Sequence, residues 1–464
     1  MHTSLNRKLG YYKSFHWIFI LFLSIISISQ QCIALDFACS AKVGDISIKI
    51  KDYKNRIHGF WLGQNIGNWT GLITEMDKIG TQATMPFYTD NDWGKADQRA
   101  FWGEFVPHSS EINFYLVAEG NHWGADDDTD MEYLYAHLHS TNQATKLTPT
   151  EIRDGWLKHI YSEDDAPFYR KFPSSEPVKE NFLWVSNETA RILMDKGFYP
   201  PKTSDAKLNP NNSMIDAQLT TEIFGLLAPA NPKVALEISS LPIMTTARGD
   251  AALIASFYVI LHSLAIDLYP DEDLGKNLRS FAKTASAVFP NQSTPAKILN
   301  FVLSDYENNN DKNNWESTRD KIYKRYQIQS NDGYTYKKPF DANINFAASL
   351  VSLLYGNGDF KRTIQIATLS GWDSDNPAAT WGGLLGFILG KDKIKMLFPD
   401  TNLSETFWIH RTRRNFPTFT DGESGVDRFS IMAERESKIA GQIIKEKMNG
   451  CFDKEKERWI FSVN

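Results

Sequence analysis

Four glycines at a spacing of four residues constrain this chain more than any other feature. Gly59, Gly63, Gly67 and Gly71 all lie within the segment 57–75. At 3.6 residues per turn, this spacing puts them on one face of a helix, which then carries no side chains. Each glycine costs a helix about 1 kcal/mol relative to alanine. The pattern therefore predicts either close packing against another helix or the approach of a ligand to bare backbone, and both can hold together.

The composition is that of an ordinary globular protein. Of 464 residues, 42% are hydrophobic and 23% are charged, which excludes a disordered chain, a collagen-like fibre and a coiled coil. Lys and Arg number 50 and Asp and Glu number 56, so the net charge is −6. The chain therefore lacks the excess of basic residues that is typical of nucleic-acid-binding proteins, and we expect no nucleic-acid binding.

Apolar residues recur mainly at helical spacing, and Ile46–Lys51 is the best candidate for a strand. Since no repeat or low-complexity linker divides the chain, we expect a single all-α domain over residues 35–464, with a C-terminal extension from about residue 392. The predicted helices are Met131–His139, Glu151–His159, Glu188–Lys196, Thr220–Leu227, Ala251–Leu268, Ala342–Tyr355, Thr363–Leu369, Ala378–Leu389 and Asp427–Met448.

The first 34 residues predict a signal peptide. A basic start is followed by an apolar run over 15–28 and by small residues at Cys32–Ala34. An uncleaved anchor is the alternative. Polar residues interrupt the apolar stretch Ala251–Leu268, which favours a buried helix over a membrane span. We therefore expect a secreted or extracytoplasmic protein with no membrane span after cleavage.

Two cysteines remain after the predicted cleavage, Cys39 and Cys451, near opposite ends of the chain. Chain termini often lie close together, and an oxidising compartment permits a bridge between them. A disulfide and a pair of free thiols both stay open at this point.

An acidic run, Asp126-Asp127-Asp128-Thr129-Asp130, precedes the first of the apolar helical segments. Adjacent carboxylates repel one another, so a fold that keeps them together needs compensation. Taken alone, the run is most simply a capping cluster, because acidic residues suit the first turn of a helix.

A second acidic pair stands at another predicted helix start, in Gly371-Trp372-Asp373-Ser374-Asp375-Asn376-Pro377. Pro377 suits the first helical position, and small residues follow at 378, 379, 382 and 383, which would let the helix pack closely. Alone, this pair too is more often structural. Together the two segments offer oxygen ligands without nearby Cys or His, which favours Mg²⁺, Mn²⁺ or Ca²⁺ over Zn²⁺. Two metal ions bridged by carboxylates from both segments would fit, whereas no EF-hand loop is present.

In this order the three motifs resemble the ADP-ribosylglycohydrolase family. Its Gly-rich helix commonly ends in Gly-Asp, here Gly67-Asn68, and some members carry a Glu beyond it, here Glu75. Its Thr/Ser-Asp-Asp-Thr run corresponds to Asp126–Thr129, and its Gly-Gly-Asp-Thr-Asp-Thr motif to Gly371–Asn376. The likeness extends from about residue 52 to 448 and implies an all-α, compact orthogonal helical bundle with a dinuclear metal centre.

The resemblance also implies roles for single residues. The catalytic residues would be Glu75, which orients substrate or moves a proton, and Asp127, a general base. Asn68, Gly249 and Trp372 would contact substrate, with Asn68 in place of the usual Asp. The implied metal ligands, for two Mg²⁺ ions or alternatively Mn²⁺, are Asp126, Asp127, Asp128, Asp373, Asp375 and Asn376; Asp126 and Asn376 stand where the family usually has Thr or Ser.

The activity that the resemblance implies is hydrolysis of the glycosidic bond at C1″ of an ADP-ribosyl group. The partner would be an ADP-ribosylated protein or a small ADP-ribose conjugate, and we expect a monomer. One alternative is a catalytically silent binding or structural protein on the same scaffold, as in the J-type crystallins. Another is a metal-free retaining glycosidase, which would not explain why the acids cluster at helix starts.

Overall fold

The structure, a computed structural model, describes residues 39, 41–98, 109–162, 168–169, 178–179, 182–270, 273–420 and 423–462. Within these ranges the secondary structure is mostly helical, so the predicted all-α class is confirmed. Residues 39–464 form one compact unit by their own contacts. The predicted signal peptide, residues 1–34, lies outside the described residues.

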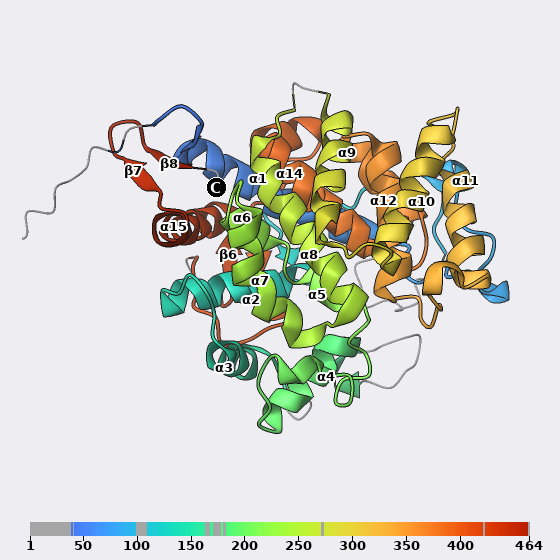
Figure 1. Ribbon diagram of the computed structural model, residues 1–464, viewed down its shortest axis with the longest axis horizontal. Coiled ribbons are helices and arrows are strands. Elements are labelled where there is room, and N and C mark those ends of the chain that lie inside the picture. Colours follow the sequence, from blue (N-terminus) through green and yellow to red (C-terminus); the bar gives the residue numbers. More distant parts are fainter. Residues whose placement is uncertain are drawn as a thin grey trace, which may run out of the picture. The chain divides into compact units, whose positions relative to one another are not determined.

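The centre of the fold is a pair of long helices, α1 (Ile50–Gly71) and α14 (Asp375–Leu397), which pack along each other (Figure 1). A β-carbon placed on Gly59 would lie 2.2 Å from the carbonyl oxygen of Gly386, and one on Gly63 would lie 2.2 Å from that of Gly382. Further along, one on Gly67 would lie 2.0 Å from the carbonyl oxygen of Ala378. The bare face of α1 therefore packs backbone against backbone on the small residues of α14, as the glycine spacing predicts.

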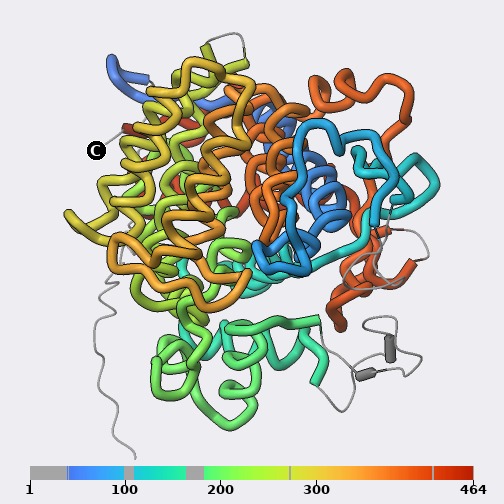
Figure 2. Tube along the Cα trace, turned by 90° about the vertical axis from the view of Figure 1, so that its right-hand side faces the viewer, coloured from blue at the N-terminus to red at the C-terminus, as the bar shows by residue number. Residues whose placement is uncertain are grey.

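The remaining helices surround this pair, and Figure 2 shows α1 in blue among the orange helices of the C-terminal half. Five of them are not predicted by the apolar spacing: α5, α7, α9, α10 and α11. Proline at position 242 interrupts the pattern in α7, and α11 is short and polar. The bounds are α2 Asp127–Asn142, α3 Pro149–His159, α4 Val185–Asp195, α5 Asp216–Leu219, α6 Ile223–Leu227, α7 Pro232–Thr246, α8 Gly249–Leu264, α9 Leu274–Ala285, α10 Thr294–Asn308, α11 Trp315–Ile322, α12 Ala342–Gly356, α13 Phe360–Leu369 and α15 Phe429–Lys447.

Three small sheets complete the described structure. Antiparallel β1 (Asp45–Lys49), β8 (Arg458–Ser462) and β7 (Cys451–Asp453) form the first, with β8 in the middle. The second has β5 (Thr406–Trp408) between parallel β2 (Trp123–Gly124) and antiparallel β6 (Val426–Arg428). The third pairs β3 (Phe168–Tyr169) with β4 (Val178–Lys179). The predicted strand is thus present, but it ends two residues early because α1 begins at Ile50.

The end of the chain is built into the fold. The predicted boundary near residue 392 falls inside α14, which continues to Leu397. Beyond it, β5 joins β2 and β8 joins β1, while α15 packs on α1. Cys39 and Cys451 form a disulfide, with their Cα atoms 5.8 Å apart, so the first of the two possibilities left open by the sequence is realised.

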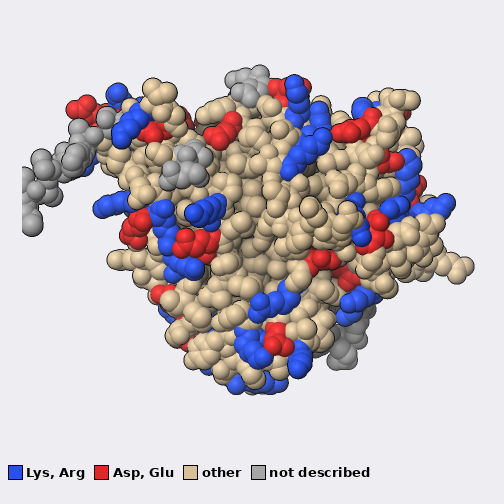
Figure 3. All heavy atoms as spheres, in the orientation of Figure 1, with Lys and Arg blue, Asp and Glu red and all other residues tan. Residues whose placement is uncertain are grey.

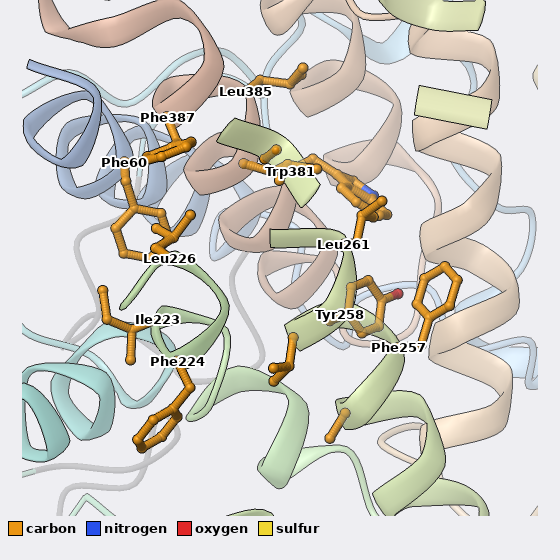
Figure 4. Packing of buried hydrophobic residues seen from close by; sticks show 14 of the residues in the cluster. Phe60, Ile223, Phe224, Leu226, Phe257, Tyr258, Leu261, Trp381, Leu385 and Phe387 are labelled. Carbon is orange, nitrogen blue, oxygen red and sulfur yellow. The ribbon is translucent and has the colours of Figure 1, made fainter. Parts of the chain in front are cut away.

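The hydrophobic core lies between the central pair, α6 and α8 (Figure 4). Phe60 of α1, Leu226 of α6, and Tyr258 of α8 are fully buried there with Trp381 of α14. Among the described residues, Gly249–Asp267 alone is long and apolar enough to cross a membrane by length and composition, but 67% of its most apolar window is buried inside the protein. This agrees with the predicted buried helix.

Candidate metal centre

Acidic side chains from distant parts of the sequence meet at the start of α14. Carboxylate oxygens of Glu75, Asp373 and Asp375 all lie within 4.8 Å of one another. The charge of Asp375 also acts on Asp127 and Asp128. The two acidic segments, which the sequence separates by about 245 residues, therefore interact electrostatically. We call Glu75, Asp127, Asp128, Asp373 and Asp375 the carboxylate cluster.

The glycine face of α1 brings Glu75 to this place. At the end of α1, a β-carbon on Gly71 would lie 2.3 Å from the Cα atom of Asp375, so the last turn of α1 rests directly on the start of α14. The Ser374 hydroxyl donates to the carbonyl oxygen of Gly71 at 3.0 Å. The turn that carries Glu75 is thus fixed by the same close approach that the glycines permit.

Backbone hydrogen bonds tie the Glu75 turn to the segment that carries Asp373. The N–H of Met76 donates to the carbonyl oxygen of Trp372 at 2.9 Å, and the N–H of Trp372 donates to that of Lys78 at 2.8 Å. The Thr74 hydroxyl donates to the carbonyl oxygen of Thr368. Glu75 therefore lies in a turn that hydrogen bonds hold in place, and not on a mobile lid over the site.

The start of α2 supplies the other side of the site. Asp126 is the N-cap residue of α2, and its N–H donates to the Thr129 hydroxyl at 3.3 Å. The side-chain amide of Asn68, at the end of α1, donates to a carboxylate oxygen of Asp128 at 2.9 Å. Capping and a functional role are therefore combined here, since the positive end of the helix dipole stabilises acidic groups at its N-terminus.

Burial and mutual repulsion raise the pKa of these groups. Burial, followed by neighbouring carboxylates, raises the pKa of Glu75, Asp127, Asp128 and Asp373 well above their ordinary values. Burial also raises the pKa of Asp375, to about 6. For Asp126, burial raises the pKa and the Arg411 guanidinium opposes it. Ionising all of these carboxylates together is therefore costly without a cation between them.

The donor set fits a hard divalent cation. All the candidate ligands are oxygens, the preference of Mg²⁺, Mn²⁺ and Ca²⁺. The Oδ1 atom of Asn68, whose amide nitrogen donates to Asp128, is buried and has no hydrogen-bond partner among the described residues. Within the described ranges, no other group of three or more His, Cys, Asp or Glu side chains comes as close as Glu75, Asp373 and Asp375. The ligand roles of Asp126, Asp127, Asp128, Asp373 and Asp375 stay predictions.

Three predicted site residues, Trp372, Asn68 and Asn376, are buried and contact other side chains of the protein. The Trp372 ring is fully buried against Phe87, and its Nε1 donates to Gln327 at 2.8 Å. Asn68 is fully buried too and orients Asp128. The Oδ1 atom of Asn376, the predicted neutral ligand, accepts a hydrogen bond from Gln218 at 2.8 Å. The substrate-binding roles of Asn68 and Trp372 and the metal-ligand role of Asn376 stay predictions.

Gly249, by contrast, lines a pocket of about 480 Å³. The pocket is bounded by the loop at Asn212–Ser213, the start of α8 and the residues before and within the first turn of α12. Helix α12 also reaches the carboxylate cluster, because the Oδ1 atom of Asn345 accepts the Asp373 N–H at 3.3 Å. The pocket and the cluster therefore share a helix turn.

Sequence reasoning missed three residues near the cluster. Asp216, whose charge acts on Asp127 and Asp373, is an isolated acid in its segment and belongs to no acidic pattern. Asn345 is one of two amides, with Asn343, in the first turn of an otherwise apolar helix, and shows no pattern of its own. Arg411 donates to the carbonyl oxygen of Ala125 at 2.7 Å, and the basic run 411–414 was the signal that could have identified it.

A comparison with protein-family models identifies one family. The model of the family described as ADP-ribosylglycohydrolase matches residues 49–412. A solved structure titled "ADP-ribosylglycohydrolase-related protein complex" aligns with 84% of this chain and 99% of its own, at 13% sequence identity and a TM-score of 0.48. No curated protein matches the sequence.

Proposed function

This chain belongs to the ADP-ribosylglycohydrolase family, and on that premise we propose that it is a divalent-metal-dependent hydrolase of the glycosidic bond in an ADP-ribosyl conjugate. The observation that carries the proposal is the approach of carboxylate oxygens of Glu75, Asp373 and Asp375 to within 4.8 Å of one another, with the charge of Asp375 acting on Asp128 as well. A purely structural descendant would have no need to keep acidic groups together at this cost in repulsion.

Asp127, Asp128, Asp373 and Asp375 would hold the metal, with Asp126 and Asn376 beside them. Mg²⁺ is the metal we propose, with two ions as the family resemblance implies. When bound, such ions orient hydroxyl groups of the substrate and lower the pKa of water.

The carboxylates also suit the transition state of glycoside hydrolysis. Positive charge develops on the sugar ring as the bond to the leaving group breaks, and nearby negative oxygens stabilise it. Asp127, at the first position of α2, would take the proton from the attacking water. Glu75 would accept a hydrogen bond from the sugar and fix its position, since its turn is held by the Met76 and Trp372 hydrogen bonds.

The pocket beside Gly249 would take the part of the substrate remote from the reacting carbon. Its lining includes Arg248, Lys337, Asn212 and Asn343. A volume of about 480 Å³ falls in the range usual for ligand pockets.

The proposal extends to where the protein works. A disulfide between Cys39 and Cys451 suits an oxidising compartment, which supports a secreted or extracytoplasmic location. On the face shown in Figure 3, basic and acidic residues are interspersed. The absence of nucleic-acid binding stays a prediction. The monomeric state stays a prediction.

A hydrolysis screen tests the proposed function. The full chain is incubated with ADP-ribosyl-arginine peptide, ADP-ribosyl-serine peptide and NAD, each with Mg²⁺, with Mn²⁺ and with a chelator. We expect release of ADP-ribose from at least one conjugate, and its loss with the chelator. Turnover that ignores the chelator contradicts the metal mechanism. Binding of ADP-ribose without turnover of any conjugate would favour the silent binding protein instead.

A further inference from the structure

Gln327 links the two segments that carry Glu75 and Asp373. Its Nε2 atom donates to the carbonyl oxygen of Ile79 at 2.9 Å, and its Oε1 atom accepts from Nε1 of Trp372 at 2.8 Å. Ile79 lies four residues after Glu75, and Trp372 is the residue before Asp373. One half-buried side chain therefore holds both segments, although it takes no part in the proposed mechanism.

The orientation of the Gln327 amide follows from its two partners. An indole N–H can only donate and a carbonyl oxygen can only accept, so Oε1 must face Trp372 and Nε2 must face Ile79. Glutamate would keep the acceptor but would place a second oxygen against the Ile79 carbonyl. Methionine, of similar length, would offer no N–H donor and only a weak acceptor. Both bonds therefore require an amide at this position.

The backbone that carries Gln327 is irregular. Helix α11 continues into η6 (Tyr323–Ile328), a π-helical stretch. Such stretches are rare, and they occur frequently at functional sites. The Tyr323 hydroxyl of η6 donates to the carbonyl oxygen of Gly80 at 3.0 Å. A β-carbon on Gly80 would lie 2.5 Å from the Tyr323 ring and 2.8 Å from Nε2 of Gln327, so η6 packs directly on the end of the Glu75 turn.

The segments that Gln327 joins contain two residues in an unfavourable backbone conformation. Met76 has a φ of 60° and Trp372 a φ of 58°, in the left-handed region that residues with side chains rarely adopt. The Met76 N–H donates to the Trp372 carbonyl oxygen at 2.9 Å, so the two residues meet. Such a conformation persists only where the surroundings hold it, and it is typical of functional sites. The bond from the indole to Gln327 is one of the contacts that hold Trp372.

The Asp373 segment has an anchor of its own, whereas the end of the Glu75 turn depends on Gln327. The Asp373 N–H donates to Oδ1 of Asn345 in α12 at 3.3 Å. The Ile79 carbonyl oxygen has Gln327 as its only hydrogen-bond donor among the described residues. Loss of the Gln327 amide should therefore displace Glu75 more than Asp373.

We propose that Gln327 is a positioning residue that keeps Glu75 in its place within the carboxylate cluster. It acts through the carbonyl group of Ile79 and the indole of Trp372, and it touches neither substrate nor metal. The inference rests on the proposed function, because the position of Glu75 matters for turnover only if the cluster is the reaction centre. A displacement of about 1 Å can lower the rate of a reaction about a hundredfold.

Gln327→Met is the probe, because it keeps the length of the side chain and removes the amide that makes both hydrogen bonds. Turnover of the best ADP-ribosyl conjugate by the full chain is measured in saturating Mg²⁺, with and without Glu75→Gln. We expect Gln327→Met to lower turnover at least about tenfold in the otherwise native chain, and less than about twofold when Glu75→Gln is already present. A residue that only stabilises the fold would lower turnover equally in both backgrounds.

Two measurements that do not depend on turnover accompany the assay. Hydrogen exchange of the peptide that covers residues 74–80 should be at least about fivefold faster in Gln327→Met, because the bond from the Met76 N–H to Trp372 opens more often. Mg²⁺ affinity should change less than about twofold, since the proposed ligands keep their own anchors.

Gln329→Met is the matched control. It makes the same substitution two residues later, where the side chain is exposed and its Oε1 atom accepts from Asn331 at 3.1 Å. Turnover, exchange and Mg²⁺ affinity should all match those of the wild type. If Gln327→Met does not fold, Gln327→Glu takes its place, because it keeps the acceptor for Trp372 and loses only the bond to Ile79; the same non-additivity with Glu75→Gln is expected.

Each other outcome overturns the inference. An equal fall in turnover in both backgrounds means that Gln327 does not act through Glu75. Faster exchange with wild-type turnover means that Gln327 holds the turn without a role in the reaction. A clear fall in Mg²⁺ affinity means that Gln327 acts through Asp373. If the wild-type chain hydrolyses no conjugate, the proposed function fails and the positioning role fails with it, whereas the exchange measurement still shows whether Gln327 holds the turn.

Discussion

The α1–α14 interface and the carboxylate cluster at its end are built on opposite principles. Along the interface, Gly59 and Gly63 meet Gly386 and Gly382 with no side chain between the backbones. At its end, Asp375 lies among other carboxylates whose pKa values are raised by burial and by each other. One region removes side chains to gain close packing, and the other gathers side chains that repel.

The difference shows how the two regions depend on each other. Close-packed backbones leave little room for adjustment, because interiors are dense and a shift of one helix moves its neighbour. The last contact of the interface, Gly71 on Asp375, is also the first element of the cluster. The close-packed α1–α14 interface, which we call the frame, can hold repelling groups in place until a cation binds. Changes in the frame should therefore affect folding, and changes in the cluster should affect function.

The largest effect is expected in the frame, from Gly63→Ala. The added methyl would lie 2.2 Å from the carbonyl oxygen of Gly382, which is backbone and cannot rotate away. We expect a loss of at least about 3 kcal/mol of unfolding free energy, or no folded protein, by denaturant unfolding. Gly441→Ala in α15, where the nearest atoms belong to the Trp459 side chain, is the matched control and should be tolerated. Equal effects at the two positions would contradict the close-packed frame.

In the cluster, Asp375→Ala should abolish metal-dependent hydrolysis and leave the protein folded. A bound metal contributes several kcal/mol to transition-state stabilisation, so turnover should fall at least about a thousandfold. The measurement is turnover of the best conjugate with saturating Mg²⁺, together with circular dichroism. Asp392→Ala, an exposed acid on the same helix, should keep wild-type turnover. Normal turnover in Asp375→Ala would exclude the carboxylate cluster as the reaction centre.

The same comparison shows what the sequence could predict. The glycine spacing predicted the bare face of α1, and the small residues after Asn376 predicted close packing of the second helix, because both follow from local helical geometry. The juxtaposition of Asp128 with Asp375 was predicted from oxygen-only chemistry and from the family resemblance. Local patterns were enough wherever one helix face or one motif carried the information.

What the sequence could not predict depends on long-range contacts. Trp372 was expected to contact substrate, but its ring is buried against Phe87, a residue far away in the chain. Asp216 shows no pattern of its own, and only the fold reveals that it accepts hydrogen bonds from the backbone N–H groups of Ser186 and Asn187. The cross-linked turn at Glu75 depends on hydrogen bonds with Trp372, about 300 residues later, which no local rule anticipates.

Glu75→Gln tests the point where frame and cluster meet. Glutamine keeps the size of the side chain and removes its charge and basicity, so turnover should fall about a hundredfold or more, the usual scale for a positioned acid–base group. Thermal stability should change little, because the turn is held by backbone hydrogen bonds. Glu111→Gln, on an exposed loop, is the control for turnover. A variant with near-normal turnover would leave the chemistry to the other carboxylates alone.

The smallest expected effect is a change in the melting temperature of Asp375→Asn. Its sign tells whether Asp375 stabilises the fold or serves the carboxylate cluster. Burial raises the pKa of Asp375 to about 6, above its ordinary value near 4, so ionising this group in the folded, metal-free protein is unfavourable. A group with a raised pKa gives stability that is complete below the unfolded pKa and is lost as pH rises through the folded pKa. The side chain in Asp375→Asn cannot ionise. Without metal, this variant should therefore melt a few degrees higher than wild type above about pH 6, and the difference should vanish below about pH 4.

Saturating Mg²⁺ at pH 7 should reverse the order of the two melting temperatures, because it stabilises only the chain that binds it tightly. Differential scanning fluorimetry across pH, with and without Mg²⁺, measures both signs. If the metal-free variant melts below wild type at pH 7, Asp375 belongs to the frame. Its carboxylate then stabilises the fold and is not kept for binding a cation.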